Sequence, residues 1–205
     1  MSMTVPPRLV AALLAAFVAV VLAQDALRSD VSEVEHWVSH LSLGPDGWVN
    51  IAALTLAGLA TLALRRPVRD RSGRRWSGRW ITVAGVGLVL AGVFVSDAPP
   101  GTRYDEAVTW HGVLHEVGGG LTFVGLIATC LVTRRMLSHR WGLLAAVVLA
   151  VAWVGASVMA GISYADGGPA LPSGIAERVA LFTGIAWLIA LGLHLHQEDP
   201  ERREA

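Results

Sequence analysis

Six long apolar segments constrain this chain more than any other feature of its sequence. A helix needs about 20 mainly apolar residues to cross the hydrocarbon core of a bilayer. The chain is 54% hydrophobic and only 16% charged, whereas soluble domains carry about 25% charged residues. We therefore predict an all-α integral membrane protein in which residues 1–205 form one domain, a bundle of six transmembrane helices. The predicted spans are residues 8–24, 48–64, 80–96, 110–132, 141–163 and 175–195.

The distribution of arginine predicts how the bundle is oriented. Segment 65–79 holds seven arginines and one aspartate, and segment 133–140 holds three arginines and no acidic residue. The alternate segments each hold one arginine, against five acidic residues in 24–47 and three in 96–109. The positive-inside rule then places the arginine-rich loops in the cytoplasm. With six spans, both the N-terminus and the C-terminus are expected in the cytoplasm as well.

The first span has a second interpretation. Residues 1–23 also resemble a secretory signal, because Arg8 precedes a short apolar stretch that ends in small residues before Gln24. Cleavage there would leave five spans and would move no loop to the other side of the membrane. We expect the span to be retained, since its leader carries only one basic residue and two prolines.

The stretch "TWHGVLHEVGGG" places two histidines at the predicted outer end of the fourth span. His111 and His115 are one helical turn apart, so their side chains share a face. Such a pair chelates transition metals when an acid or a third histidine completes the shell. Asp97 closes the preceding span and is the natural third ligand, and His40 is a candidate fourth. The sequence therefore contains a candidate zinc site.

Other polar residues are expected at the same end of the bundle. The predicted cluster there consists of Asp97, His115, His111, Asn50, Glu177 and Arg178. Its purely structural interpretation is open too: histidines often hydrogen-bond across helices, Asp97 can cap the fourth helix, and Arg178 can pair with Asp97, Glu116 or a lipid phosphate. The glycines at 118–120, with Gly112 and Gly125, are expected to let another helix approach closely.

Several of these motifs resemble one known family. The stretches "VSHLSLGPDGWVN", "AGVFVSD", "GVLHEVGGGLTF" and "GIAERV" are similar to the bacterial and archaeal membrane family called "domain of unknown function 998". The resemblance covers nearly the whole chain and implies six helices in a bacterial inner membrane. It implies no activity. Asp97 and His115 match the family's acid at the close of the third helix and its histidine in the fourth, whereas His111 has no place in that pattern.

The sequence is compatible with three functions. The first is lipid binding, or a structural or assembly role, carried by the polar cluster. The second is a zinc-dependent intramembrane hydrolase of a lipid ester or amide, in which Ser39 or Glu116 assists proton transfer. The third is electron transfer through a b-type haem. Membrane lipids are the expected partners, with a homo-oligomer or another membrane protein as further possibilities. A nucleic-acid partner is not expected, because the net charge is zero.

Overall fold

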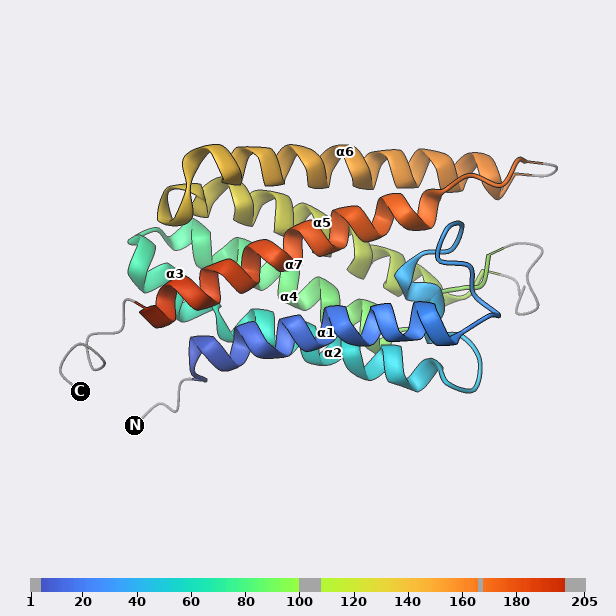
Figure 1. The fold of residues 1–205 in the computed structure, drawn as a ribbon, viewed down its shortest axis with the longest axis horizontal. Helices are drawn as coiled ribbons and strands as arrows, with labels where there is room; N and C mark the ends of the chain where they lie inside the picture. The colour runs from blue at the N-terminus through green and yellow to red at the C-terminus, as the bar shows by residue number, and fades with distance from the viewer. Residues whose placement is uncertain (1–4, 100–107, 166–167, 198–205) are drawn as a thin grey trace.

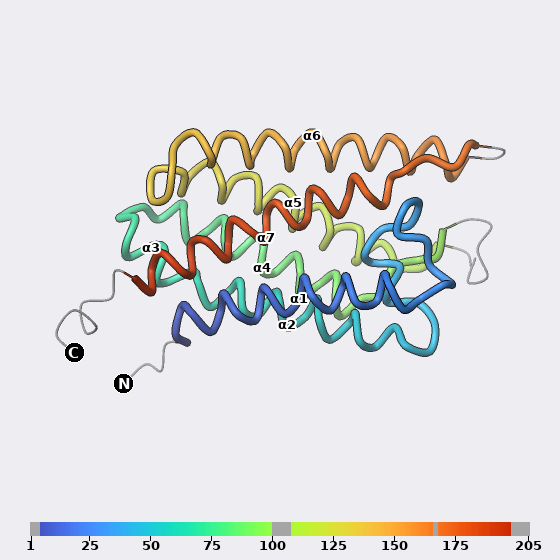
Figure 2. Tube along the Cα trace, in the orientation of Figure 1, coloured from blue at the N-terminus to red at the C-terminus, as the bar shows by residue number. Residues whose placement is uncertain are grey.

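The computed structural model describes residues 5–99, 108–165 and 168–197, and these residues form helices and connecting segments without strands. Figure 1 and Figure 2 show the helices side by side in one elongated bundle. Among these described residues, six helical segments are long and apolar enough to cross a membrane, as predicted. The elements are α1 (Pro7–Leu27), the 3₁₀ helix η1 (Val38–Ser42), α2 (Gly47–Ala63), α3 (Arg65–Ser72), α4 (Arg75–Val93), α5 (Trp110–Leu137), α6 (His139–Ser163) and α7 (Ser173–Gln197).

The helices differ from the predicted spans mainly at their ends. Helix α5 runs five residues beyond its predicted limit, to Leu137, because a polar last turn can project from the hydrocarbon core while it keeps helical hydrogen bonds. Helix α4 stops at Val93 rather than at residue 96, because the backbone turns extended at Phe94. Histidines of α5 form hydrogen bonds with the backbone carbonyl groups that follow this early end of α4.

Glycines allow α4 and α5 to pack backbone to backbone. A Cβ atom on Gly87 would lie 2.6 Å from the carbonyl oxygen of Gly118, and one on Gly125 would lie 2.4 Å from the amide nitrogen of Ala84. The predicted close approach is therefore confirmed for Gly118 and Gly125. Gly119 and Gly120 differ, because a Cβ on either would meet no atom within 4 Å. Only part of the glycine run is a packing surface.

The first helix contributes directly to the core of the bundle. Helix α1 packs against α2 and α7, and its residues Val10, Leu14, Phe17 and Val21 are buried. A bundle without these side chains would expose the apolar faces of α2 and α7 that they cover. This packing supports the prediction that the first span is retained.

The two ends of the bundle differ in chemistry. At one end lie the beginning of α1, helix α3 and the end of α7 (Figure 1), and we call it the arginine-rich end because α3 and the start of α4 supply arginines. At the other end, residues 28–46 with η1 fold over the helix termini, and we call this the capped end. The beginning of α1 and the end of α7 therefore lie at the same end of the bundle as α3 and the start of α4. The side of the membrane on which they lie stays a prediction.

Candidate functional site

The cap begins with an arginine that ties the loop after α1 to η1. Arg28 donates to the carbonyl oxygens of Leu41 at 2.6 Å and Leu43 at 2.9 Å, and its guanidinium also pairs with Asp30 at 2.6 Å. The loop is thus folded back on itself by a charged side chain that reaches two backbone carbonyl groups. The cap is consequently an ordered part of the fold and positions the side chains described next.

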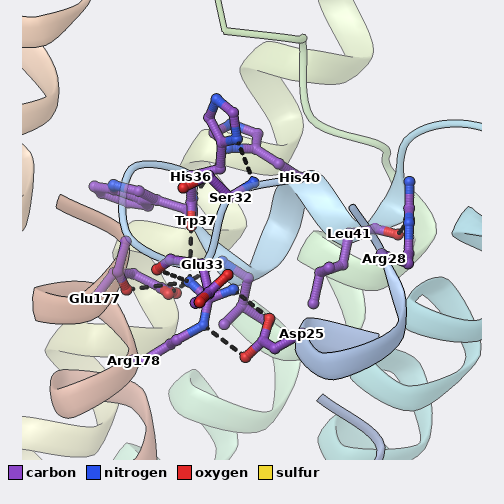
Figure 3. Close-up of polar contacts among 12 residues, drawn as sticks. Asp25, Arg28, Ser32, Glu33, His36, Trp37, His40, Leu41, Glu177 and Arg178 are labelled. Atoms are coloured by element: carbon purple, nitrogen blue, oxygen red, sulfur yellow. Dashed lines mark hydrogen bonds and ion pairs between the residues drawn. The ribbon is translucent and has the colours of Figure 1, made fainter. Parts of the chain in front are cut away.

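Helix α7 holds the cap through Arg178, which is 7% exposed. Its guanidinium forms a two-point contact with the carboxylate of Asp25 at 2.9 and 2.6 Å, and it donates to the carbonyl oxygen of His36 at 2.7 Å (Figure 3). A buried guanidinium requires such partners because desolvation strongly disfavours an unpaired charge. The ion pair joins the end of α1 to the start of α7. The partner of Arg178 is thus Asp25 rather than Asp97 or Glu116.

Glu177 and Asn50 hold η1 from two sides. A carboxylate oxygen of Glu177, a residue only 4% exposed, accepts the backbone N–H of Val38 at 3.1 Å. The buried amide of Asn50 donates to the carbonyl oxygen of Val38 at 2.8 Å and to the hydroxyl of Ser42 at 3.0 Å. Helices α7 and α2 therefore both form hydrogen bonds to the backbone of Val38 in the cap. The predicted cluster members Asn50, Glu177 and Arg178 do converge, and they do so on the cap.

Two histidines of the cap are held in one tautomer by backbone amides. The Nδ1 atom of His36 accepts the N–H of Ser32 at 3.0 Å, and the Nδ1 atom of His40 accepts the N–H of Trp37 at 3.1 Å. Each neutral ring then carries its proton on Nε2. Burial, with smaller contributions from His36, His115 and Arg178, lowers the pKa of His40 to about 3. His40 is therefore a neutral imidazole at physiological pH.

Asp97 forms hydrogen bonds at the start of α5. Its carboxylate accepts the backbone N–H of Thr109 at 3.1 Å and the hydroxyl of Thr109 at 2.6 Å. The same hydroxyl accepts the N–H of Gly112 at 3.1 Å and so caps the start of α5. Asp97 thus fastens the N-terminus of α5, which is the structural alternative considered for it above.

The histidines of α5 bind the backbone that follows α4. His115 donates from Nδ1 to the carbonyl oxygen of Phe94 at 2.8 Å, since a carbonyl can only accept. The Nδ1 atom of His111 lies 2.9 Å from the Thr109 hydroxyl and 3.3 Å from the carbonyl oxygen of Val95. In neutral His115 the lone pair is therefore on Nε2, which leaves that atom as an acceptor for a ligand.

A small cavity of about 40 Å³ lies beneath the cap. His115, Glu116, Glu177 and Ser39 line it together with Trp37, and its other walls are mostly apolar. One wall residue, Glu116, is exposed on α5, so this wall of the cavity lies at the surface of the bundle. The cavity has room for about one water molecule, whose share of liquid volume is about 30 Å³.

The sequence profile of one family matches almost all of this architecture. That family is described as "Protein of unknown function (DUF998)", and its match covers residues 9–194. The chain belongs to this family. No curated protein and no solved structure gave a match. The DUF998 match begins within α1 and ends within α7, so all six spans belong to the family's domain.

The candidate zinc ligands of this DUF998 protein are distributed over two parts of the capped end. Asp97 and His111 are engaged with Thr109, whereas His40 belongs to η1 and is bound to the backbone of Trp37. Within residues 5–99, 108–165 and 168–197, no three His, Cys, Asp or Glu side chains are grouped so that they could hold a metal ion. The zinc site and the haem site stay predictions without a supporting arrangement among those residues.

Three important residues were absent from the predicted cluster of the DUF998 protein. Asp25 pairs with Arg178, Thr109 links Asp97 to α5, and Trp37 lines the cavity. A signal for Asp25 was present, because an arginine in an apolar span requires an acid and Asp25 directly follows the first span, as Asp97 follows the third. No comparable pattern marked Trp37, whose position depends on how the cap folds.

Proposed function

We propose that this DUF998 protein binds the terminal ammonium or hydroxyl group of an amphiphilic molecule, most simply a membrane lipid, in the water-sized cavity beneath the cap. The observation that carries the proposal is the lining of the cavity, where the polar groups of His115, Glu116 and Glu177 meet apolar walls that include Leu88 and Phe123. Ligand sites typically combine mainly apolar walls with a few convergent polar groups.

The polar groups of the cavity favour a head that donates hydrogen bonds. Two of them are carboxyl groups. His115 offers Nε2 as an acceptor, because its Nδ1–H donates a hydrogen bond to the carbonyl oxygen of Phe94. The nearby positive charge of Arg178 is already paired with Asp25. An ammonium or hydroxyl group therefore suits the cavity, whereas a phosphate does not.

The remainder of such a molecule would leave the cavity along α5. Glu116 marks the wall of the cavity that lies at the surface of the bundle, and Gly119 lines the cavity while presenting no side chain. A Cβ on Gly119 or Gly120 would meet only open space. An apolar chain running along this face would lie in the hydrocarbon region, where it has no need of a protein-enclosed tunnel.

The test compares two lipids and two matched variants. Phosphatidylethanolamine and phosphatidylcholine with the same acyl chains differ in whether the head can donate hydrogen bonds. We expect native mass spectrometry of the detergent-purified protein to show preferential retention of phosphatidylethanolamine. Gly119→Leu should abolish that preference by filling the mouth of the cavity. Gly120→Leu is the control, because it adds the same side chain to the same helix without lining the cavity.

The outcome separates binding from the structural role. Equal retention of both lipids, or equal loss in both variants, would contradict the proposal and leave the polar residues as fastenings of the cap and of α5. A hydrolase has one supporting observation, namely that Ser39 and Glu116 line the same cavity as His115. Mass-spectrometric zinc analysis of the wild type and His115→Ala decides that alternative, which requires near-stoichiometric zinc that the variant lacks.

A further inference from the structure

A second site lies at the arginine-rich end, far along the bundle from the cap. Helix α3 folds back on the start of α4 after Gly73, whose φ of 65° places it in the left-handed region. The two helices approach closely at Gly78, where a Cβ would lie 3.1 Å from the carbonyl oxygen of Arg65. Buried Val68 anchors α3 to the bundle. This hairpin brings arginines from both helices to one place.

Four arginines surround the groove between these helices. The groove has a volume of about 630 Å³ and is lined by Arg65 and Arg69 of α3 and by Arg75 and Arg79 of α4. Pockets for small molecules usually measure about 300–1,000 Å³. None of the described residues that line the groove is acidic. Four like charges around one groove repel each other, and an anion between them would relieve that repulsion.

Among the residues that the structure describes, those that line the groove give it a strongly positive charge. Arg69 pairs with Asp70 at 2.8 Å. In the part of the chain that the structure describes, Arg65, Arg75 and Arg79 have no carboxylate partner. Guanidinium groups bind phosphate through two parallel hydrogen bonds, which a lysine cannot reproduce. The N–H groups of these three arginines are therefore available to donate hydrogen bonds to a phosphate group.

The walls of the groove add an apolar surface to this charge. Trp76 is 59% exposed, and the guanidinium of Arg79 lies 4.8 Å from the centre of its ring. Trp80 and Val83 continue the lining along α4 toward the hydrocarbon core. Tryptophan favours the boundary between lipid and water. The groove therefore combines a phosphate-binding mouth with a wall suited to an acyl chain, which a free anion would not use.

We propose that this groove binds an anionic phospholipid, with its phosphate between the arginines and an acyl chain against Trp80 and Val83. Basic pockets at helix ends are a recurrent means of recognising anionic headgroups. The site is independent of the cavity beneath the cap, because it lies at the opposite end of the bundle and requires the opposite charge in its ligand.

The experiment uses the full chain in a neutral detergent and native mass spectrometry. Phosphatidylglycerol and phosphatidylcholine with identical acyl chains are offered as probes. We expect the wild type to bind phosphatidylglycerol with an apparent Kd about tenfold or more lower than that for phosphatidylcholine. Arg65→Gln/Arg75→Gln should remove this preference. Arg8→Gln/Arg140→Gln is the matched control, because it removes two exposed arginines elsewhere in the chain that do not line the groove.

Each other outcome would overturn the proposal. Equal affinity of the wild type for the two lipids would exclude recognition of the negative headgroup. Equal loss in the control variant would show that the general charge of this end, rather than the groove, attracts the lipid. Displacement of phosphatidylglycerol by inorganic phosphate alone would identify a free-anion site. The two wild-type measurements remain decisive even if the groove variant does not fold.

Discussion

At the scale of single residues, the capped end depends on polar side chains that replace water for buried backbone groups. Arg178 donates a hydrogen bond to a carbonyl oxygen of the cap, and Glu177 accepts one from a backbone N–H there. His115 donates to the carbonyl oxygen of Phe94. Unpaired polar groups at such positions would cost about 1–3 kcal/mol each. The polar residues of the spans therefore stabilise the fold. Binding of a ligand must be tested separately from stability.

The ion pair between Asp25 and Arg178 gives the first prediction. Both side chains are nearly buried, with 11% and 9% exposed. We expect Asp25→Asn to lower the free energy of unfolding by about 3–5 kcal/mol, because it leaves a buried guanidinium without its counter-charge. Denaturation by a strong detergent in mixed micelles measures this change. Asp30→Asn removes an acid from the more exposed pair with Arg28 and should cost about 1 kcal/mol or less. Equal effects of the two changes would contradict the structure.

His40 gives a prediction about pH. Its folded pKa of about 3 lies below the ordinary value of 6.5, so the unfolded chain binds more protons between these values. The contribution of His40 to stability is therefore full above about pH 6.5 and is lost as the pH decreases toward the folded pKa. At about 1.4 kcal/mol per unit, the loss between pH 7.5 and 5 is on the order of 2 kcal/mol.

The matched variant for this prediction is His40→Asn. Asparagine places an acceptor near the position of Nδ1, so it can still receive the N–H of Trp37, yet it does not titrate. We expect unfolding curves of His40→Asn to depend less on pH over the same range than those of the wild type. An unchanged pH dependence would assign the effect to other groups.

At the scale of elements, the bundle relies on close helix contacts through glycine, and the contact between α4 and α5 is the clearest case. Gly125 stands against the backbone of α4, where a Cβ would lie 2.4 Å from Ala84 N and 2.7 Å from Ala84 Cα. Backbone atoms cannot move aside as the end of a flexible side chain can. The glycines that face open space on the same helix provide an internal comparison.

We expect Gly125→Ala to destabilise the bundle by about 1–3 kcal/mol, because the added methyl group forces α4 and α5 apart. Gly120→Ala should be neutral or stabilising by up to about 1 kcal/mol, since alanine is the better helix former and the position is open. Thermal unfolding of the two variants in the same detergent measures the difference. Similar melting temperatures would show that the two helices are not packed as closely as described.

Across the whole molecule, the two ends of the bundle differ in the charged groups that line their cavities. The arginine-rich end has a groove suited to an anion, and the capped end has a small cavity with carboxyl groups. The positive-inside rule predicts that the first faces the cytoplasm and the second faces outward. An oligomer of such bundles stays a prediction of the sequence.

The orientation is tested by labelling single cysteines in intact cells. The only native cysteine, Cys130, is buried, so Cys130→Ala provides a background with no cysteine. We expect a membrane-impermeant maleimide to label Asp46→Cys at the capped end and to leave Gly73→Cys unlabelled until the membrane is permeabilised. The reverse pattern would invert the predicted topology, and labelling of neither site would question their exposure.

The six spans could be predicted from the amino-acid sequence alone, and so could the alternation of arginine-rich and acidic loops. Both are local properties, because the length of an apolar run decides whether it spans and each further span reverses the side of the next loop. The family could also be identified from the sequence, because its short motifs can be recognised without a structure. The polar residues at the capped end were found in the same way, since an ionisable side chain beside an apolar run is conspicuous without a structure.

How those polar residues pair depends on the packing of the helices and could not be predicted. Asp25 and Arg178 are separated by 153 positions, and they meet because α1 packs against α7. Asp97 and His115 both lie near the end of the α4–α5 contact, yet Asp97 binds Thr109 and His115 binds the backbone at Phe94. Hydrogen bonds demand a donor and an acceptor within about 3 Å, and such distances are set by helix rotation and by the path of the cap rather than by spacing along the chain.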